Sequence, residues 1–424
     1  MTHNFDVIII GAGAAGLMAA GAAAEQSARV LLLEKMSRPG RKLLISGKGR
    51  CNLTNIAPPE EFIKHFGKNG QFLRQAFNAF SPDKLVAFFA YLGVETVNER
   101  GGRVFPVSQK ALDVVDALQN WVVNSGVNIS PNTDVESLLM EDGRCVGVHI
   151  RGVEKQPGRD IYGKTVIIAT GGKSYPATGS TGDGYRLAES VGHTILPTMP
   201  ALVPLMTEPK PKGDLVGLSL RNINAQLWID GKKHSEQFGE MEFSRNGLTG
   251  PVILTLSKQV VEALHKKSKV EIVLDLKPAL NVQKLDRRLR RDLELLGKRQ
   301  FGNILKGLLP VMMIPYCIAQ TGIPYAKYGN QVSSEERKRL RIWLKECRWN
   351  VTGHRSYAEA IVTAGGVKLS EINPRTMGSR LVEGLYFAGE VIDVDADTGG
   401  FNLQAAFSMG RMAGQAAAEF ATRD

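Results

Sequence analysis

The glycine-rich run at residues 11–16 (GAGAAG) constrains the fold of this chain more than any other segment. It follows directly on an apolar, β-branched stretch at residues 5–10 and opens an alanine-rich stretch that continues to about residue 26. A second apolar run, residues 29–33, ends at Glu34. Strand, glycine turn, helix, strand and acid in this order predict a βαβ unit that binds a dinucleotide.

The small residues of this turn have separate physical tasks. Gly11 permits the tight bend from strand to helix, Gly13 lets a pyrophosphate approach the backbone, and Gly16 lets the helix pack closely on the sheet. Backbone N–H groups at the start of the helix then hold the phosphates in the positive end of the helix dipole. The groups best placed for this are those of Ala14 and Ala15.

Glu34 limits the choice of dinucleotide. It stands 23 residues after Gly11, close to the roughly 20 expected for a carboxylate that binds the ribose hydroxyls. An acid at this position disfavours a 2′-phosphate, so the site suits FAD or NAD and not NADP.

Two segments in the first half of the chain favour FAD over NAD. Residues 132–136 lead into a hairpin whose turn is Asp142-Gly143. In FAD proteins of the glutathione-reductase type, a residue in the place of Val135 meets the adenine through its backbone. Residues 165–172 look like a strand entering a glycine turn and resemble the ATG motif of many flavoproteins. The candidate cofactor contacts in that turn are Thr170 and Gly171.

A segment near the C-terminus completes the FAD pattern. Residues 385–390 read as a strand that ends in Gly389-Glu390, and this matches the second FAD fingerprint, in which the acid binds the ribityl chain. Glu390 replaces the commoner Asp. A glycine turn and a helix at residues 404–419 follow, and a helix start aimed at the flavin would stabilise negative charge on the reduced ring. The candidate contacts at this helix start are Asn402 and Leu403.

Further motifs resemble a known family. Gly40-Arg41-Lys42 and residues 46–55 (SGKGRCNLTN) look like the GRK…SGxGRCNxTN segment of a widespread bacterial family of NAD(P)/FAD-dependent oxidoreductases. Residues 362–367 and the GEVxDVD motif at residues 389–395 are similar too. The family includes aminoacetone-oxidase-like and bile-acid-dehydrogenase-like enzymes, and the resemblance covers essentially the whole chain. One departure is Ala-Asp at positions 396–397, where the family usually has a glycine.

The loop at residues 47–55 is the best candidate for lining the flavin ring. Its glycines would let the backbone approach the flavin, and its polar side chains could bind flavin or a substrate carbonyl. Its candidate contacts are Gly47, Gly49, Arg50 and Asn52, and the other motifs add Lys35, Arg41, Lys42 and Gly366. Cys51 has no partner cysteine nearby in sequence, so packing or backbone geometry is favoured over redox exchange with the flavin.

The resemblance implies an α/β fold in which an FAD-binding Rossmann-like domain of the glutathione-reductase type is interrupted by an insert. The insert is expected to contain a β-barrel and a helical subdomain. Residues 222–229 alternate with period two up to the turn Asp230-Gly231, residues 269–276 form another strand candidate, and two later stretches have helically spaced apolar residues. A linker is marked by Pro197, Pro200, Pro204, Pro209 and Pro211. The expected boundaries are 1–197 for the first part of the FAD domain, 198–355 for the insert (barrel 198–276 and about 347–355, helical 277–346) and 356–424 for the second part.

The net charge of +11 comes largely from two windows, residues 284–306 and 335–348. Both fall on expected helices of the insert, so the simplest interpretation is a solvated helix face without a binding function. The alternative is contact with RNA or with an anionic substrate.

Composition and cysteine placement exclude other classes. Hydrophobic residues make up 43% of the 424 residues and charged residues 22%, which excludes a wholly disordered chain. No apolar stretch reaches the roughly 18 residues of a membrane span, so no membrane partner is expected. Asp6 interrupts the first apolar run and no basic region precedes it, unlike a signal peptide. The cysteines at 51, 145, 317 and 347 are too scattered for a redox pair or a metal site. A cytoplasmic location is expected.

The predicted function is an FAD-dependent oxidoreductase that passes a hydride between flavin and a small organic substrate. The runner-up is a flavin-dependent RNA-modifying protein, and the third alternative is a flavin-bound sensor without turnover. No second GxGxxG follows residue 34, so NAD(P)H, if it serves as reductant, would have to bind transiently over the flavin. The oligomeric state is not predicted. The side chains that could move a proton are Arg50, Asn52, Tyr175 and His354, and no spacing singles out one of them.

Overall fold

The computed structural model describes residues 4–152 and 157–423, and these fold into two compact units. Unit 1 holds Met1–Ala201 and Tyr357–Asp424, and unit 2 holds Leu202–Ser356. Each unit has a hydrophobic core of its own. No helix among the described residues is long and apolar enough to cross a membrane.

Unit 1 is built on a seven-stranded sheet in the order β6-β2-β1-β9-β8-β7, with β18 also paired to β9. β1 pairs in parallel with β2 and β9, and β18 is parallel to β9. The apolar strands in the middle are buried on both faces, which is why they read as continuous hydrophobic runs. The strands are β1 (Phe5–Ile10), β2 (Val30–Leu33), β6 (Asn128–Ser130), β7 (Val135–Glu141), β8 (Arg144–Ile150), β9 (Arg159–Ile168) and β18 (Leu385–Phe387).

The predicted hairpin between β7 and β8 is confirmed. Its turn residues, Asp142 and Gly143, have φ values of 48° and 80°. Two central residues with positive φ are typical of the two-residue turns that match the twist of a hairpin.

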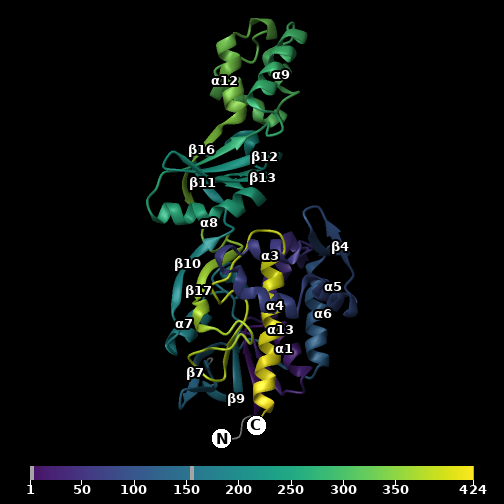
Figure 1. Ribbon diagram of the computed structural model, residues 1–424, viewed down its shortest axis with the longest axis vertical. Coiled ribbons are helices and arrows are strands. Elements are labelled where there is room, and N and C mark those ends of the chain that lie inside the picture. The colour runs from purple at the N-terminus through teal and green to yellow at the C-terminus, as the bar shows by residue number, and fades with distance from the viewer. Residues whose placement is uncertain (1–3, 153–156, 424) are drawn as a thin grey trace. The chain divides into compact units, whose positions relative to one another are not determined.

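The helices of unit 1 pack on this sheet and on each other. They are α1 (Ala14–Ala24), α2 (Arg41–Ile45), α3 (Pro59–Lys64), α4 (Arg74–Ala79), α5 (Pro82–Tyr91), α6 (Ala111–Asn124), α7 (Asp183–Ser190) and α13 (Phe401–Thr422). The first helix, α1, lies beside the last, α13 (Figure 1). The alanine-rich composition of α1 serves this contact because small side chains let two helix backbones approach closely.

Two smaller sheets complete unit 1. One joins β3 (Thr54–Asn55), β5 (Arg103–Pro106) and β4 (Thr96–Glu99), and the other joins β10 (Ile195–Ala201) to β17 (Val362–Val367). The prediction of a linker that starts at the first proline was wrong, because Pro197 and Pro200 lie within β10. Prolines are tolerated there since β10 pairs with β17 alone among the described strands, and the register breaks between Leu196 and Met199.

Unit 2 contains the predicted barrel and the predicted helical piece. Six strands close in the order β11-β14-β13-β12-β15-β16. They are β11 (Leu205–Glu208), β12 (Ser219–Ile229), β13 (Lys232–Ser244), β14 (Gly247–Thr249), β15 (Val270–Asp275) and β16 (Cys347–His354). The helices after β15 are α9 (Val282–Leu295), α10 (Phe301–Leu305), α11 (Ile314–Thr321) and α12 (Ser334–Lys345). An additional helix, α8 (Pro251–His265), lies within the segment expected to form only the barrel, and the sequence interpretation missed it.

Candidate functional site

A cavity of about 1340 Å³, which includes space open to solvent, lies at the carboxyl ends of parallel strands in unit 1. Ligands of open α/β sheets bind at this edge. Most of the predicted cofactor-binding residues line it: Gly11, Gly13, Ala14, Ala15, Glu34, Lys35, Arg41, Lys42, Val135, Thr170, Gly171, Gly389, Glu390, Asn402 and Leu403.

The glycines of the first turn differ in their surroundings. A Cβ at Gly11 (φ 99°) would lie 2.8 Å from the carbonyl oxygen of Ala169, and one at Gly16 would lie 1.8 Å from that of Gly11. Nothing lies within 4 Å of a Cβ at Gly13, which lines the cavity. Gly16 packs against the turn and does not line the cavity. The turn therefore closes tightly on itself and leaves its open side toward the cavity.

Glu34 lies at the end of β2 with only 9% of its surface exposed. Its Oε2 accepts a hydrogen bond from the Ala12 amide at 2.9 Å, and its Oε1 accepts one from the Met36 amide at 2.8 Å. Burial raises the pKa of the Glu34 carboxyl, although the two amides oppose the shift. A carboxylate has about four lone-pair sites, so Glu34 can still accept hydrogen bonds from a ligand.

Lys35, the next residue, is held beside the cavity by two groups near the start of α7. Its ammonium donates to Asp183 Oδ2 at 2.5 Å and to the Thr181 hydroxyl. Burial acts to raise the pKa of Asp183, but the hydrogen bonds from Lys35 and Thr181 outweigh it, and the pKa is lowered. On the same helix, Arg186 donates to the backbone carbonyl of Val135.

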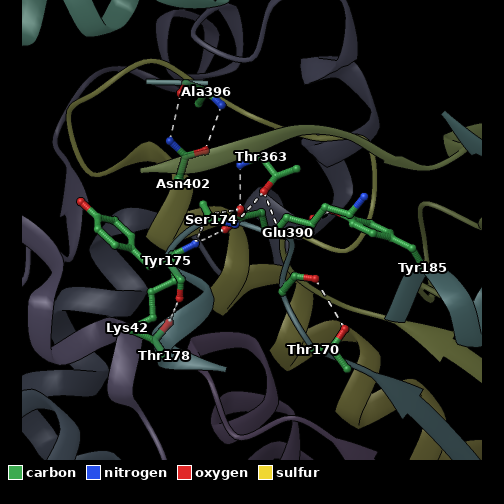
Figure 2. A network of polar contacts seen from close by, with 12 residues as sticks. Lys42, Thr170, Ser174, Tyr175, Thr178, Tyr185, Thr363, Glu390, Ala396 and Asn402 are labelled. Atoms are coloured by element: carbon green, nitrogen blue, oxygen red, sulfur yellow. Dashed lines mark hydrogen bonds and ion pairs between the residues drawn. The ribbon is translucent and has the colours of Figure 1, made fainter. Parts of the chain in front are cut away.

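A second ion pair crosses from α2 to the turn after β18. The Lys42 ammonium donates to Glu390 Oε2 at 2.7 Å and to the Ser174 hydroxyl at 2.6 Å. Glu390 Oε1 accepts from the Ser174 hydroxyl at 2.8 Å and from the Thr363 amide at 2.7 Å. Figure 2 shows these side chains converging from four separate segments of the chain. The sequence identified Lys42 and Glu390 as separate contacts and gave no indication that they bind each other.

The loop before α13 is held by side chains of α13 and of the segment after α3. Asn402 accepts a hydrogen bond from the Ala396 amide at 2.9 Å and donates to the Ala396 carbonyl at 3.0 Å (Figure 2). Asp397 binds His65 Nδ1 at 2.9 Å, and the His65 ring stacks on Phe401 with centroids 3.9 Å apart. Sequence reasoning missed His65, because nothing near position 65 marks it as a partner of residue 397.

The remaining predicted contacts lie outside the cavity lining. A Cβ at Gly366 would lie 2.7 Å from the Val391 carbonyl, so this glycine serves close packing. Arg50 pairs with Glu99 at 2.9 Å and stacks over Phe105 at 4.0 Å from the ring centroid. The other residues of this loop that do not line the cavity are Gly47, Gly49 and Asn52. Asn52 Oδ1 is buried without a hydrogen-bond partner among the described residues.

Cys51 is fully buried and has a φ of 61°. Burial raises the pKa of its thiol to about 12, so the thiolate needed for redox exchange is absent at neutral pH. Burial thus favours the packing role expected for Cys51 over redox exchange.

Two of the four candidate acid–base side chains, Tyr175 and His354, belong to different units. Tyr175 lies outside the cavity lining, and burial together with the nearby Glu359 raises the pKa of its phenol. His354 belongs to unit 2, where its Nδ1 lies 2.8 Å from the Arg355 carbonyl.

One titratable cluster lies elsewhere in unit 1. Buried His193 contacts the Ser379 hydroxyl through Nε2 at 2.8 Å, and its Nδ1 lies 3.3 Å from Glu371 Oε2 without hydrogen-bond geometry. The Ser379 oxygen also accepts from the amides of Leu381 and Val382, so its lone pairs are engaged in a turn. This arrangement is structural and not nucleophilic. Within the described ranges, no group of three or more His, Cys, Asp or Glu side chains could hold a metal ion.

Comparison with protein families and proteins of known name gives consistent results. Residues 5–416 match the model described as HI0933-like protein Rossmann domain. A 3-dehydro-bile acid delta(4,6)-reductase from Clostridium scindens is 32% identical over 413 residues, which cover 97% of this chain and 98% of that protein. A ribosomal RNA dihydrouridine synthase from Escherichia coli strain K12 is 30% identical over 412 residues, with 96% of each chain covered.

Solved structures share the fold at low sequence identity. A 3-ketosteroid delta1-dehydrogenase from Sterolibacterium denitrificans superposes with a TM-score of 0.56 at 14% identity, over 99% of this chain and 100% of that one. A flavocytochrome c3 fumarate reductase gives a TM-score of 0.54 at 17% identity, over 99% of this chain and 79% of that one. At these identities the likeness shows the fold alone.

Proposed function

The chain belongs to the HI0933-like family of Rossmann-domain proteins and is an FAD-dependent oxidoreductase, and from this premise we propose that it passes a hydride between FAD and a small organic substrate. One observation carries the proposal. The glycine turn and Glu34 from the first part of the chain line the same cavity as Gly389, Glu390 and the start of α13 from the last part.

The groups that line the cavity fit a dinucleotide. Gly13 leaves room for a pyrophosphate, and the first N–H groups of α1 have no carbonyl partner within the helix. Arg41 lines the cavity and has no hydrogen-bond or ion-pair partner in the described part of the chain, so its charge is available to the phosphates. We assign the ribose hydroxyls to Glu34 and an adenine contact to the backbone of Val135.

The bound flavin would supply the hydride chemistry, and the chain would supply binding, orientation and exclusion of water. The bile-acid reductase among the relatives, by its name, reduces an unsaturated carbonyl compound. Enones are therefore the first substrate class to test on this chain. NAD(P)H remains a proposed reductant that would bind transiently.

The experiment has two steps. The purified protein is denatured and the released cofactor is identified, and FAD is expected. The protein is then mixed anaerobically with NADH, NADPH, amines or enones while the flavin absorbance is recorded. Bleaching by a reductant, or recolouring of the reduced flavin by an enone, supports the proposal. Release of FMN, or of no flavin, contradicts it.

A second candidate function is modification of RNA. It is favoured by the relative named ribosomal RNA dihydrouridine synthase and by the basic surface of α9. Part of the basic charge of the helical piece is paired internally, because Arg337 and Arg341 of α12 both bind Asp286 of α9. Binding of RNA that weakens steeply with salt would support this candidate over the first.

A further inference from the structure

The ion pair between Lys42 and Glu390 uses most, but not all, of its hydrogen-bonding positions within the protein. Lys42 has three N–H donors, of which two go to Ser174 and Glu390. The carboxylate of Glu390 has about four acceptor sites, of which three are used, two on Oε1 and one on Oε2. One N–H of Lys42 and one acceptor site on Glu390 Oε2 therefore have no partner in the described residues.

The unused N–H and the unused acceptor site both belong to side chains that line the cavity. The side chains of Lys42 and Glu390 are 27% and 19% exposed, whereas Ser174, which locks them together, is completely buried. Thr363, also buried, fixes the same network from β17, because its hydroxyl accepts from the amides of Lys173 and Ser174. Buried Ser174 and Thr363 thus hold the pair in place, and one donor and one acceptor of the pair remain for a ligand in the cavity.

The charge of the pair sums to zero only while both partners are present. A flavin that gains two electrons and one proton gains one negative charge. A lone carboxylate beside the cofactor would therefore oppose reduction, and a lone ammonium would assist it.

We infer that Lys42 is a positioning residue whose charge balances Glu390, so that the cavity holds oxidised and reduced FAD with similar affinity. The inference rests on the proposed function, because it requires FAD in this cavity. It goes further by coupling two side chains that the sequence presents as independent contacts. Lys42 keeps the Glu390 carboxylate available to a cofactor hydroxyl without leaving an uncompensated negative charge.

The test compares the affinity of the apoprotein for oxidised FAD with its affinity for FAD reduced anaerobically with dithionite. For Lys42→Met, reduced FAD is expected to lose about tenfold more affinity than oxidised FAD, which lowers the two-electron potential by about 30 mV. Glu390→Gln is expected to shift the potential in the opposite direction. The double variant is expected to return close to the wild-type potential, although its affinity for both forms falls.

Two further variants make the result specific. Lys42→Arg keeps the charge and should keep the potential. Lys35→Met removes another lysine that lines the same cavity and leaves Asp183 without its ammonium partner. Lys35 follows Glu34, which we assign to the ribose, so this carboxylate would lie at the adenosine end of FAD and not at the ring that is reduced. The variant should therefore weaken both forms of FAD by the same factor. Glu390→Gln tests the inference independently if Lys42→Met does not fold.

If Lys42→Met and Glu390→Gln each lose the same affinity for oxidised and for reduced FAD, the inference alone is overturned. The ion pair would then have only a structural role. A wild-type apoprotein that binds no FAD would overturn the proposed function together with the inference.

Discussion

The carbonyl oxygen of Ala15 lies 2.3 Å from the position that a Cβ on Gly410 would occupy. The relationship repeats one turn later, where Gly414 faces the carbonyl of Ala19 at 2.2 Å. The first and last helices of the chain therefore touch backbone to backbone, and the start of each one lines the cavity. Any side chain at these glycines must push the two helices apart and displace the helix starts that line the cavity.

Gly410→Ala is expected to lower the free energy of unfolding of unit 1 by about 1–3 kcal/mol, because the added methyl group overpacks a contact between two backbones. Retention of FAD should fall as well. Calorimetry and flavin release measure the two effects. Gly307→Ala is the matched control, since its Cβ would meet only the Ile304 carbonyl at an ordinary 3.5 Å. Equal melting temperatures for Gly410→Ala and the wild type would show that the helices can adjust.

Glu34→Gln is expected to weaken FAD binding about tenfold to a hundredfold, since hydrogen bonds to a charged group contribute about 1.5–3 kcal/mol. Glutamine keeps one acceptor for the amides of Ala12 and Met36, so it disturbs the fold less than alanine would. Fluorescence quenching of FAD by the apoprotein measures the affinity. Glu262→Gln, an exposed carboxylate of unit 2, is the control. Unchanged affinity would mean that Glu34 does not contact the ribose.

His193 should make the stability of the protein sensitive to mild acid. Burial lowers the pKa of its imidazole below the usual value of 6.5, although Glu371 opposes the shift. The unfolded chain therefore takes up a proton near pH 6.5 that the folded chain does not. The stability is fully present above that pH and is lost as the pH falls toward the lowered folded pKa.

His193→Gln can still hydrogen-bond Ser379 but does not titrate, so its unfolding free energy should fall less between about pH 7.5 and about pH 5. Denaturant unfolding at several pH values measures the difference. His234→Gln, at an exposed position of β13, should behave as the wild type does. Parallel pH profiles for His193→Gln and the wild type would rule out this role.

Neutralising Arg287 and Arg290 separates the two candidate functions. Both are exposed on α9 and have no hydrogen-bond or ion-pair partner among the residues described. For a small-molecule enzyme, flavin reduction should not change, since exposed charges act weakly through solvent. If RNA is the substrate, the log–log salt slope should flatten by about 1.4 on a single strand and about 1.8 on a duplex.

Arg288 and Arg291 are kept in that experiment because both bind Asp292 within α9. Replacing Lys266 and Lys267, exposed beyond the end of α8, removes the same charge elsewhere in unit 2. A salt slope that falls equally in this control would indicate non-specific attraction and not an RNA site.

The parts of the fold that could be predicted are those determined by local sequence. The βαβ start follows from contiguous residues with fixed tasks, and the β7–β8 turn follows from Asp142-Gly143 alone. The helix α8 could also have been predicted. Gly250-Pro251 marks a helix start, and Val252, Ile253, Leu256 and Val260 recur at helical spacing on its buried face.

The contacts that could not be predicted join residues far apart in the chain. Lys42 and Glu390 are 348 positions apart, and each has an adequate separate explanation as a cofactor contact. His65 and Asp397 are 332 positions apart, and neither lies in a motif that requires the other. A single sequence contains the residue types of such pairs but not their geometry, which depends on how the helices and loops around α13 pack.

The pairing of β10 with β17 also has a consequence for how such proteins diversify. Ala201, the last residue of unit 1 before the excursion, is the Cα partner of Val362, a few residues after the chain returns. The two ends of unit 2 are thereby anchored on neighbouring strands, which lie about 5 Å apart in any sheet. A segment attached in this way can be lengthened, replaced or exchanged for another domain with closely spaced ends while the register of the surrounding strands stays the same. Evolution can therefore change this module separately from the dinucleotide cavity.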